Sequence, residues 1–319
     1  DLGGRGDWGS LVVSGYGKTN SGDDNDQLQT EAVPDGVTRW FGGTDNTDSS
    51  GTIEYVVLAE TGEAFRPDEE VQGLTIEGAG SGTTISHVQV TNSDDDGIEW
   101  FGGAADARNV VIQGVSDDSM DMDLGYQGTV KKALIIQGSN FGDRGHETDN
   151  NGGNAGVTPK SSPILANDTV LGNAGNEGAT MGALHREGFG GQVYRAVYTD
   201  DTVVNGGSFG SGCLDIDDEV DGDLAYGDVV FNCSAGALVS DEDSYQNNFS
   251  SEANGTTYDV YEQAVTVDNL TLAITDAPAK DASYDGPFST PAGNTVTPDD
   301  YFGAVDPSAA NPDDVANNG

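Results

Sequence analysis

Acidic residues gather in three short groups whose residue types and spacing suit the binding of a metal ion. The first group is Asp94, Asp95, Asp96 and Glu99, the second is Asp117, Asp118, Asp121 and Asp123, and the third is Asp215, Asp217, Asp218 and Glu219. Hard carboxylate oxygens at this density favour Ca²⁺ over Zn²⁺. We therefore expect calcium at these groups, although none follows the ligand spacing of an EF-hand loop. Carboxylates that fan into water are the alternative.

The same aspartates also suit cleavage of a polysaccharide, because glycoside hydrolases work with paired carboxyl groups. Such carboxyls are supplied by Asp117, Asp118 and Asp121, with Lys131 or Lys132 as a nearby cation. A lyase would instead pair calcium with a base that abstracts a proton. The candidates for that base are His146, His185 and Arg186.

Short β-branched strands recur along the chain with a fixed period. Val88-Gln89-Val90 is matched 22 residues later by Val110-Val111-Ile112, which is matched 24 residues later by Leu134-Ile135-Ile136. Leucine-rich repeats share this period, but their leucine and asparagine ladder is missing, and propeller blades need about 40 residues or more. The pattern predicts an all-β fold, a right-handed parallel β-helix (solenoid) with long loop excursions and an irregular C-terminal tail.

Interruptions of the repeat indicate the domain boundaries. We expect one β-helix domain over residues 1–274, with loop excursions at 14–50 and 139–162. Residues 275–319 are rich in Pro, Asp, Asn and Ala, and we expect them to form a tail that wraps on the helix or extends from it. No apolar stretch of about 20 residues is present, so no transmembrane segment is expected.

The two cysteines, Cys213 and Cys233, are 20 residues apart, which is close to one coil. Stacked coils lie about 4.8 Å apart, and the Cα atoms of a disulfide lie about 4.4–6.8 Å apart. We therefore expect a disulfide between neighbouring coils, with two buried thiols as the alternative. A disulfide favours an oxidising compartment.

The charge of the chain limits its partners. There are 55 acidic residues against 12 Lys and Arg, a formal net charge of -43. Nucleic acid and anionic membrane surfaces are excluded as partners, because both would be repelled. Bound divalent cations or high external salt must offset the self-repulsion, which favours an extracellular or cell-surface location.

Several longer motifs resemble a bacterial family of secreted proteins and lipoproteins. They include Gly6-Asp7-Trp8-Gly9-Ser10, Ser93-Asp94-Asp95-Asp96-Gly97-Ile98-Glu99-Trp100 and Gly182-Ala183-Leu184-His185-Arg186. The family is described as right-handed β-helix-like and has no established activity. The resemblance implies a secreted or surface-exposed β-helix and supplies no catalytic residues.

Together these observations favour an extracellular structural or adhesive protein that is stabilised by calcium and is not an enzyme. The stackable ends of a β-helix favour self-association into a homo-oligomer, a filament or a surface layer. Cell-surface glycans are the other expected partner. The alternative function is that of a polysaccharide lyase or glycoside hydrolase of the β-helix type.

Overall fold

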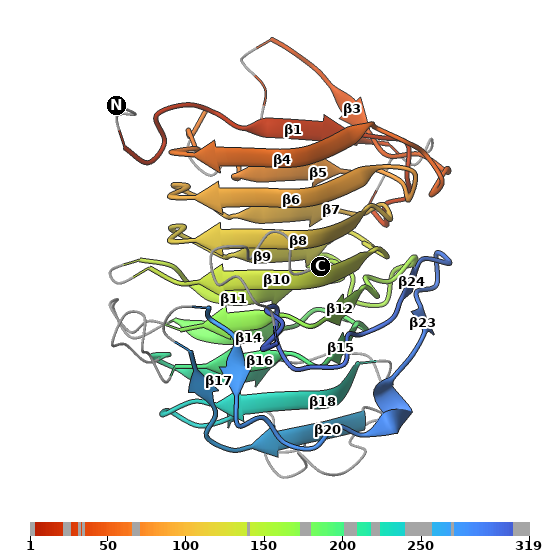
Figure 1. Cartoon of the computed structure of the whole chain (residues 1–319). Helices are drawn as coiled ribbons and strands as arrows, with labels where there is room; N and C mark the ends of the chain where they lie inside the picture. The colour runs from red at the N-terminus through yellow and green to blue at the C-terminus, as the bar shows by residue number, and fades with distance from the viewer. Residues whose placement is uncertain are drawn as a thin grey trace.

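The chain is described by a computed structural model that covers most of its length. The described residues are 4–21, 27–30, 33, 36–65, 71–138, 141–172, 180–200, 209–217, 224–239, 257–268 and 271–308. Within these ranges the regular structure is almost entirely β-strand, with one short 3-10 turn at Ala282–Tyr284. Successive strands stack into a column of coils (Figure 1).

The coils build two long sheets, and the chain alternates between them. Sheet 1 is eight-stranded and consists of β1 (Leu11–Ser14), β5 (Leu74–Glu77), β7 (Ile98–Phe101), β9 (Met120–Asp123), β11 (Arg144–Thr148), β14 (Met181–His185), β17 (Gly212–Ile216) and β19 (Leu238–Val239). Its paired strands are parallel, and each strand lies beside the strand of the next coil.

Sheet 2 takes the strands between those of sheet 1. They are β4 (Thr52–Ala59), β6 (Thr84–Thr91), β8 (Asp106–Gln113), β10 (Thr129–Ile136), β12 (Ile164–Ala166), β13 (Thr169–Leu171), β15 (Gln192–Tyr194), β16 (Val197–Thr199), β18 (Ala225–Asn232) and β20 (Thr257–Glu262). The predicted register is confirmed for the first offset, because Val88 pairs with Val110 in parallel. The second offset is wrong by one residue, because Val110 pairs with Ala133 and not with Leu134. The fold is a right-handed parallel β-helix, as the repeat predicted.

Sheet 2 bends once in each coil, at a column of residues with a left-handed backbone. The residues of this column are Tyr55, His87, Asn109, Lys132, Asn167, Arg195 and Asp228, with φ between 51° and 64°. A positive φ is uncommon for residues other than glycine. Its recurrence at one position of successive coils makes this column the corner of the helix.

The core lies between the two sheets and is filled by alternate residues of each strand. On sheet 1, Ile98 and Trp100 of β7 and Met120 and Met122 of β9 are fully buried in it. Because neighbouring residues of a strand point to opposite faces, the residues between them face outward. The outward face of sheet 1 is therefore where the acidic groups are displayed.

One of the two predicted excursions is wrong in part. Residues 139–162 were expected to leave the coil, yet β11 lies within them and pairs with both β9 and β14. In the other, residues 14–50, β2 (Leu28–Gln29) and β3 (Trp40–Phe41) form an antiparallel pair beside the main helix.

Residues 271–308 run back along sheet 2 (Figure 1). They include β22 (Ile274–Thr275), β23 (Phe288–Ser289) and β24 (Thr295–Val296). β22 pairs with β21 (Thr266–Val267). Asn294 donates hydrogen bonds to Ala104 O at 2.8 Å and to Asp106 Oδ1 at 2.7 Å. Asp299 accepts ion pairs from Lys131 at 2.6 Å and Lys132 at 2.7 Å. This segment covers the outside of sheet 2 and leaves sheet 1 uncovered by these contacts.

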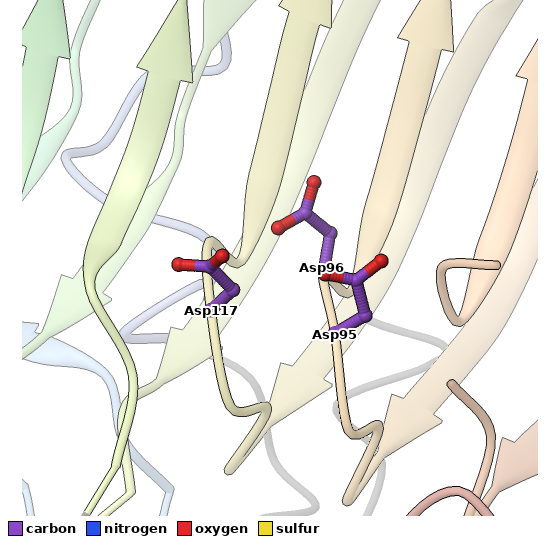
Figure 2. Close-up of side chains that lie close together, drawn as sticks. All are labelled: Asp95, Asp96 and Asp117. Carbon is purple, nitrogen blue, oxygen red and sulfur yellow. The ribbon is translucent and has the colours of Figure 1, made fainter. Parts of the chain in front are cut away.

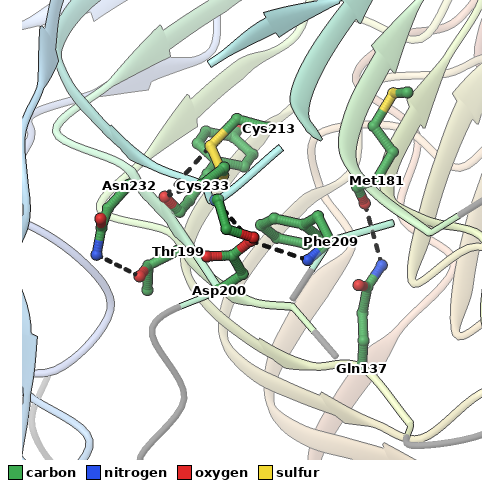
Figure 3. Close-up of a disulfide and its surroundings, with 10 residues drawn as sticks. Gln137, Met181, Thr199, Asp200, Phe209, Cys213, Asn232 and Cys233 are labelled. Atoms are coloured by element: carbon green, nitrogen blue, oxygen red, sulfur yellow. Dashed lines mark hydrogen bonds between the residues drawn. A yellow bond between two sulfur atoms is a disulfide. The ribbon is translucent and has the colours of Figure 1, made fainter. Parts of the chain in front are cut away.

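The predicted disulfide is confirmed. Cys213 of β17 is bonded to Cys233, which follows β18, and their Cα atoms are 5.6 Å apart (Figure 3). The bond therefore ties two successive stretches of the coil together. Among the described residues, no helix is long and apolar enough to cross a membrane.

Candidate functional site

Carboxylates cover the outward face of three neighbouring strands of sheet 1. The register aligns Glu99 of β7 with Asp121 of β9, and Asp121 with Glu147 of β11. A second row is formed at the ends of the strands by Asp123 and Asp149, since Asp149 N donates to Met122 O at 2.9 Å. We call these residues, together with the turn residues of the next paragraph, the acidic face.

A third row lies in the turns that lead into these strands. It contains Asp96 before β7, Asp118 before β9 and Asp143 before β11. Figure 2 shows Asp95 and Asp96 on one turn and Asp117 on the turn of the adjacent coil. The structure brings together three sets of carboxylate oxygens within 4.8 Å of one another, namely Asp95 with Asp96 and Asp117, Asp96 with Glu99 and Asp121, and Asp117 with Asp118 and Asp143.

The set formed by Asp96, Glu99 and Asp121 is short of hydrogen-bond donors. Asp96 Oδ1 accepts one bond, from Asp118 N at 2.9 Å. In the described part of the chain no donor reaches the Glu99 carboxylate, which is 7% exposed, and Asp121 Oδ1 is buried without a partner. Burial, and then the neighbouring like charges, raise the pKa of Asp96, Glu99 and Asp121 well above the usual range. Protons or a cation are needed to neutralise this set.

Asp118 and Glu147 form a carboxyl pair next to it. Burial raises the pKa of Asp118 well above its usual range, and its hydrogen bond with Glu147 and the charge of Glu147 add to the effect. Asp118 Oδ1 also accepts from Arg144 N at 2.5 Å. A carboxyl whose pKa is raised, beside a second carboxyl, is an arrangement that acid–base catalysis uses.

Arg186, directly after β14, supplies a cation to the acidic face, as does Arg144, which is ion-paired with Asp143. The Nε and Nη2 of Arg186 donate to the two oxygens of Asp149, at 2.8 Å and 3.0 Å, and Nη2 also contacts Glu147. These carboxylates raise the pKa of Arg186 against the effect of burial. A guanidinium held charged in this way orients Glu147 and does not act as a base.

His146 and His185, the other predicted bases, are not on the acidic face. Both side chains point into the core and are fully buried. His146 Nδ1 lies 3.0 Å from Tyr198 Oη, and His185 Nδ1 lies 2.5 Å from Thr148 Oγ1. Burial lowers the pKa of each to about 3, so their interior positions remove them as candidates.

Other predicted site residues lie apart from these sets. Lys131 and Lys132 are on sheet 2 and pair with Asp299, so they are not beside the aspartates as expected.

Asp94 is exposed and accepts from Ser116 Oγ at 3.2 Å. Asp215 of β17 is in register with Leu184 of β14, and the backbone N–H of Asp217 donates to His185 O at the end of the same strand. Asp218 and Glu219 lie outside the described residues.

Asp143, Glu147 and Asp149 were missed, because they fall in the stretch that was expected to be a loop. Their signal in the sequence is weak but present, since Gly145-His146-Glu147-Thr148-Asp149 alternates small or inward residues with acidic ones. The register places His146 on Met120 and Glu147 on Asp121. The alternation therefore continues the acidic column by one coil.

The fold agrees with a comparison against known families. A family model described as a pectate-lyase like beta helix domain matches residues 3–280. The chain belongs to the pectate-lyase-like β-helix family. No curated protein and no solved structure matches it.

This membership corrects one expectation from the sequence. The chain was expected not to be an enzyme, and that expectation is wrong, because pectate-lyase-like β-helices are typically enzymes that cleave polysaccharides. The alternative function, a lyase or hydrolase, agrees with the family better than the structural or adhesive role does.

Proposed function

We propose that the chain is an extracellular polysaccharide-cleaving enzyme of the glycoside hydrolase type, with the acidic face as its active site. The observation that carries the proposal is the buried pair of Asp118 and Glu147, one carboxyl with a strongly raised pKa beside one that is ion-paired with Arg186. The disulfide and the family membership support the extracellular location.

In the proposed reaction Asp118 donates its proton to the glycosidic oxygen that leaves. Glu147 is held by Arg186 and, through its hydrogen bond, orients the Asp118 acid. Because the two carboxyls of a hydrolase flank the scissile bond at about 5 Å or more, another carboxylate of the acidic face receives the proton of the attacking water. Hydrolysis is favoured over β-elimination because the histidines are buried in the core and Arg186 is kept protonated. Among the described residues of the acidic face, the groups that titrate are carboxyls, which is the equipment of a hydrolase.

We further propose that Asp96, Glu99 and Asp121 hold a Ca²⁺ ion. Their oxygens lie within 4.8 Å of one another, and Asp121 Oδ1 is buried without a donor. Oxygen ligands of this kind are what Ca²⁺ prefers. A bound cation would offset the charge of the face and help to hold hydroxyl groups of a glycan.

The test is the incubation of the purified chain with neutral and acidic polysaccharides, followed by measurement of reducing ends and of unsaturated products. We expect reducing ends without unsaturated products. Asp118→Asn should lower the rate by about 10²–10⁴-fold, as the loss of an acid–base group does. Asp94→Asn is the matched control, because it removes one charge from an exposed position near the turn and leaves the pair intact. Unsaturated products would show a lyase instead, and no cleavage of any glycan would refute the proposal.

A further inference from the structure

A pocket lies between the β2–β3 hairpin and the outward face of sheet 1. Its volume is about 260 Å³, near the lower end of the roughly 300–1,000 Å³ of small-molecule sites. The hairpin supplies Leu28 and Phe41, and β7 supplies Phe101. We call this cavity the hairpin pocket. Its size suits a single sugar ring and not a longer oligosaccharide.

The hairpin pocket adjoins the acidic face directly. Thr75 in its wall is aligned with Glu99, and Asp123 in its wall follows Asp121 by two residues on β9. The charge of Asp123 acts on both Glu99 and Asp121. A glycan that lies along the column of sheet 1 across the acidic face therefore reaches the pocket with one of its neighbouring rings.

The excursion that forms the pocket is anchored to the coils. Gly17 N donates to Gly78 O at 2.6 Å, Gly103 N donates to Lys18 O at 2.8 Å, and Asn20 N donates to Leu124 O at 3.0 Å. At Gly103, where φ is +76°, a Cβ atom would lie 2.4 Å from Ala79 O. The close contact of successive coils at this edge requires glycine. The three backbone hydrogen bonds hold the segment that precedes the hairpin against successive coils of sheet 1.

The walls of the pocket combine aromatic rings with polar groups. The rings of Phe41 and Phe101 are 6.3 Å apart and tilted by 54°, and Phe41 is 4% exposed. Gln72 is 8% exposed, and its Oε1 accepts from Thr75 Oγ1 at 2.5 Å. Within the described residues, the side-chain nitrogen of Gln72 has no acceptor. An amide donor without a partner, on a buried residue at a pocket wall, is a group that a ligand hydroxyl would satisfy.

We propose that the hairpin pocket is a substrate subsite that binds one uncharged sugar ring of the polysaccharide. The inference rests on the proposed function and names its substrate class. Glu77, 2% exposed and hydrogen-bonded by Ser14, and Asp123 both line the pocket, so a ring with a carboxylate would place a third acidic group against them. Phe101 packs against the apolar face of the ring, and the Gln72 amide donates to a ring hydroxyl.

The test measures binding of defined oligosaccharides by calorimetry, in the Asp118→Asn background so that the glycan is not cleaved. The probes are cellohexaose, xylohexaose and mannohexaose, with hexagalacturonate as the acidic probe, all in the same Ca²⁺ buffer. We expect at least one neutral probe to bind more tightly than hexagalacturonate. Phe101→Ala should weaken its binding about tenfold and Gln72→Leu about fivefold.

Trp40→Ala is the matched control, because Trp40 belongs to the same hairpin, is 52% exposed and does not line the pocket. It should leave binding unchanged, and thermal melting checks that each variant is folded. Tighter binding of hexagalacturonate, no binding of any probe, or unchanged binding in both pocket variants would overturn the inference. Pocket-dependent binding by a chain that cleaves no glycan would instead refute the proposed function and leave the sugar site standing.

Discussion

Glu147→Gln is predicted to make the protein more stable and nearly inactive. Glu147 is 9% exposed and raises the pKa of every one of its acidic neighbours for which a shift is resolved, namely Asp96, Asp117, Asp118, Asp121 and Asp149. The glutamine side chain would keep a hydrogen-bonding group of the same size and remove the charge. Arg186 would keep both of its bonds to Asp149.

The size of the gain follows from the spacing of the coils. Two charges about 4.8 Å apart repel by about 3.5 kcal/mol at an effective dielectric constant of about 20. Protonation of the neighbours and loss of the contact with Arg186 reduce this, so we expect a net gain of about 1–2 kcal/mol at neutral pH and low salt. Acid–base catalysis should fall by about 10²–10⁴-fold.

The pH dependence has a definite sign. Because the pKa of Asp118 is raised in the folded chain, that chain binds more protons than the unfolded one above the ordinary carboxyl pKa of 3.8. Its contribution to stability therefore falls as the pH rises towards the folded pKa. Glu147→Gln should flatten this fall, so its advantage is largest near neutral pH and is lost towards pH ~4.

The assay is thermal or urea unfolding of both proteins from pH ~4 to ~8, at low salt and in about 1 M NaCl, alongside the glycan assay. Salt at about 1 M screens charges within about 3 Å and should shrink the difference. Asp94→Asn is the control for a general effect of net charge. The reasoning is refuted if Glu147→Gln is no more stable than Asp94→Asn, or if it keeps full activity.

Three further predictions concern stability. Burial lowers the pKa of His146 and His185 from 6.5 to about 3, so the unfolded chain binds more protons than the folded chain between these pH values, and the free energy of unfolding falls as the pH drops. At pH ~5 the loss is at most about 2 kcal/mol per histidine, and His146→Phe should reduce the loss of stability with acid in melting curves. Ca²⁺ at about 100 times its Kd should stabilise the chain by about 2.7 kcal/mol, and Asp121→Asn should abolish the shift in Tm, whereas an equal shift in the variant would exclude the proposed ligands. Replacing both Cys213 and Cys233 by Ser should cost about 3 kcal/mol in urea unfolding, and reducing agent should add no further loss to the double variant.

The repeat made the fold predictable, and the same repeat hid part of the site. Val88 and Val110 carry the apolar alternation that identifies a coil, and the structure pairs them as expected. β11 carries no such signal, because its inward residues are His146 and Thr148 instead of aliphatic side chains. They are tolerated in the core because Tyr198 and His185 give them hydrogen-bond partners from later coils. These partners are 52 and 37 residues away in the chain, so a local pattern does not predict them.

The acidic face is not simply a consequence of the charge of the chain, because several acidic side chains elsewhere in the fold are compensated, although Asp168 keeps Oδ2 buried without a partner. Asp228 accepts from Asp281 N at 3.0 Å and from Arg195 Nε at 3.4 Å, and Asp299 is paired with two lysines.

On sheet 1, by contrast, Glu99 and Asp121 stack in register with few hydrogen-bond donors around their carboxylates. A Lys or Arg at alternate positions of the column would supply donors and a compensating charge. Such an uncompensated cluster lowers stability, and clusters of this kind occur at sites where raised pKa values or bound cations serve a reaction. The contrast between this cluster and the paired carboxylates of Asp228 and Asp299 favours an active site over a merely solvated surface.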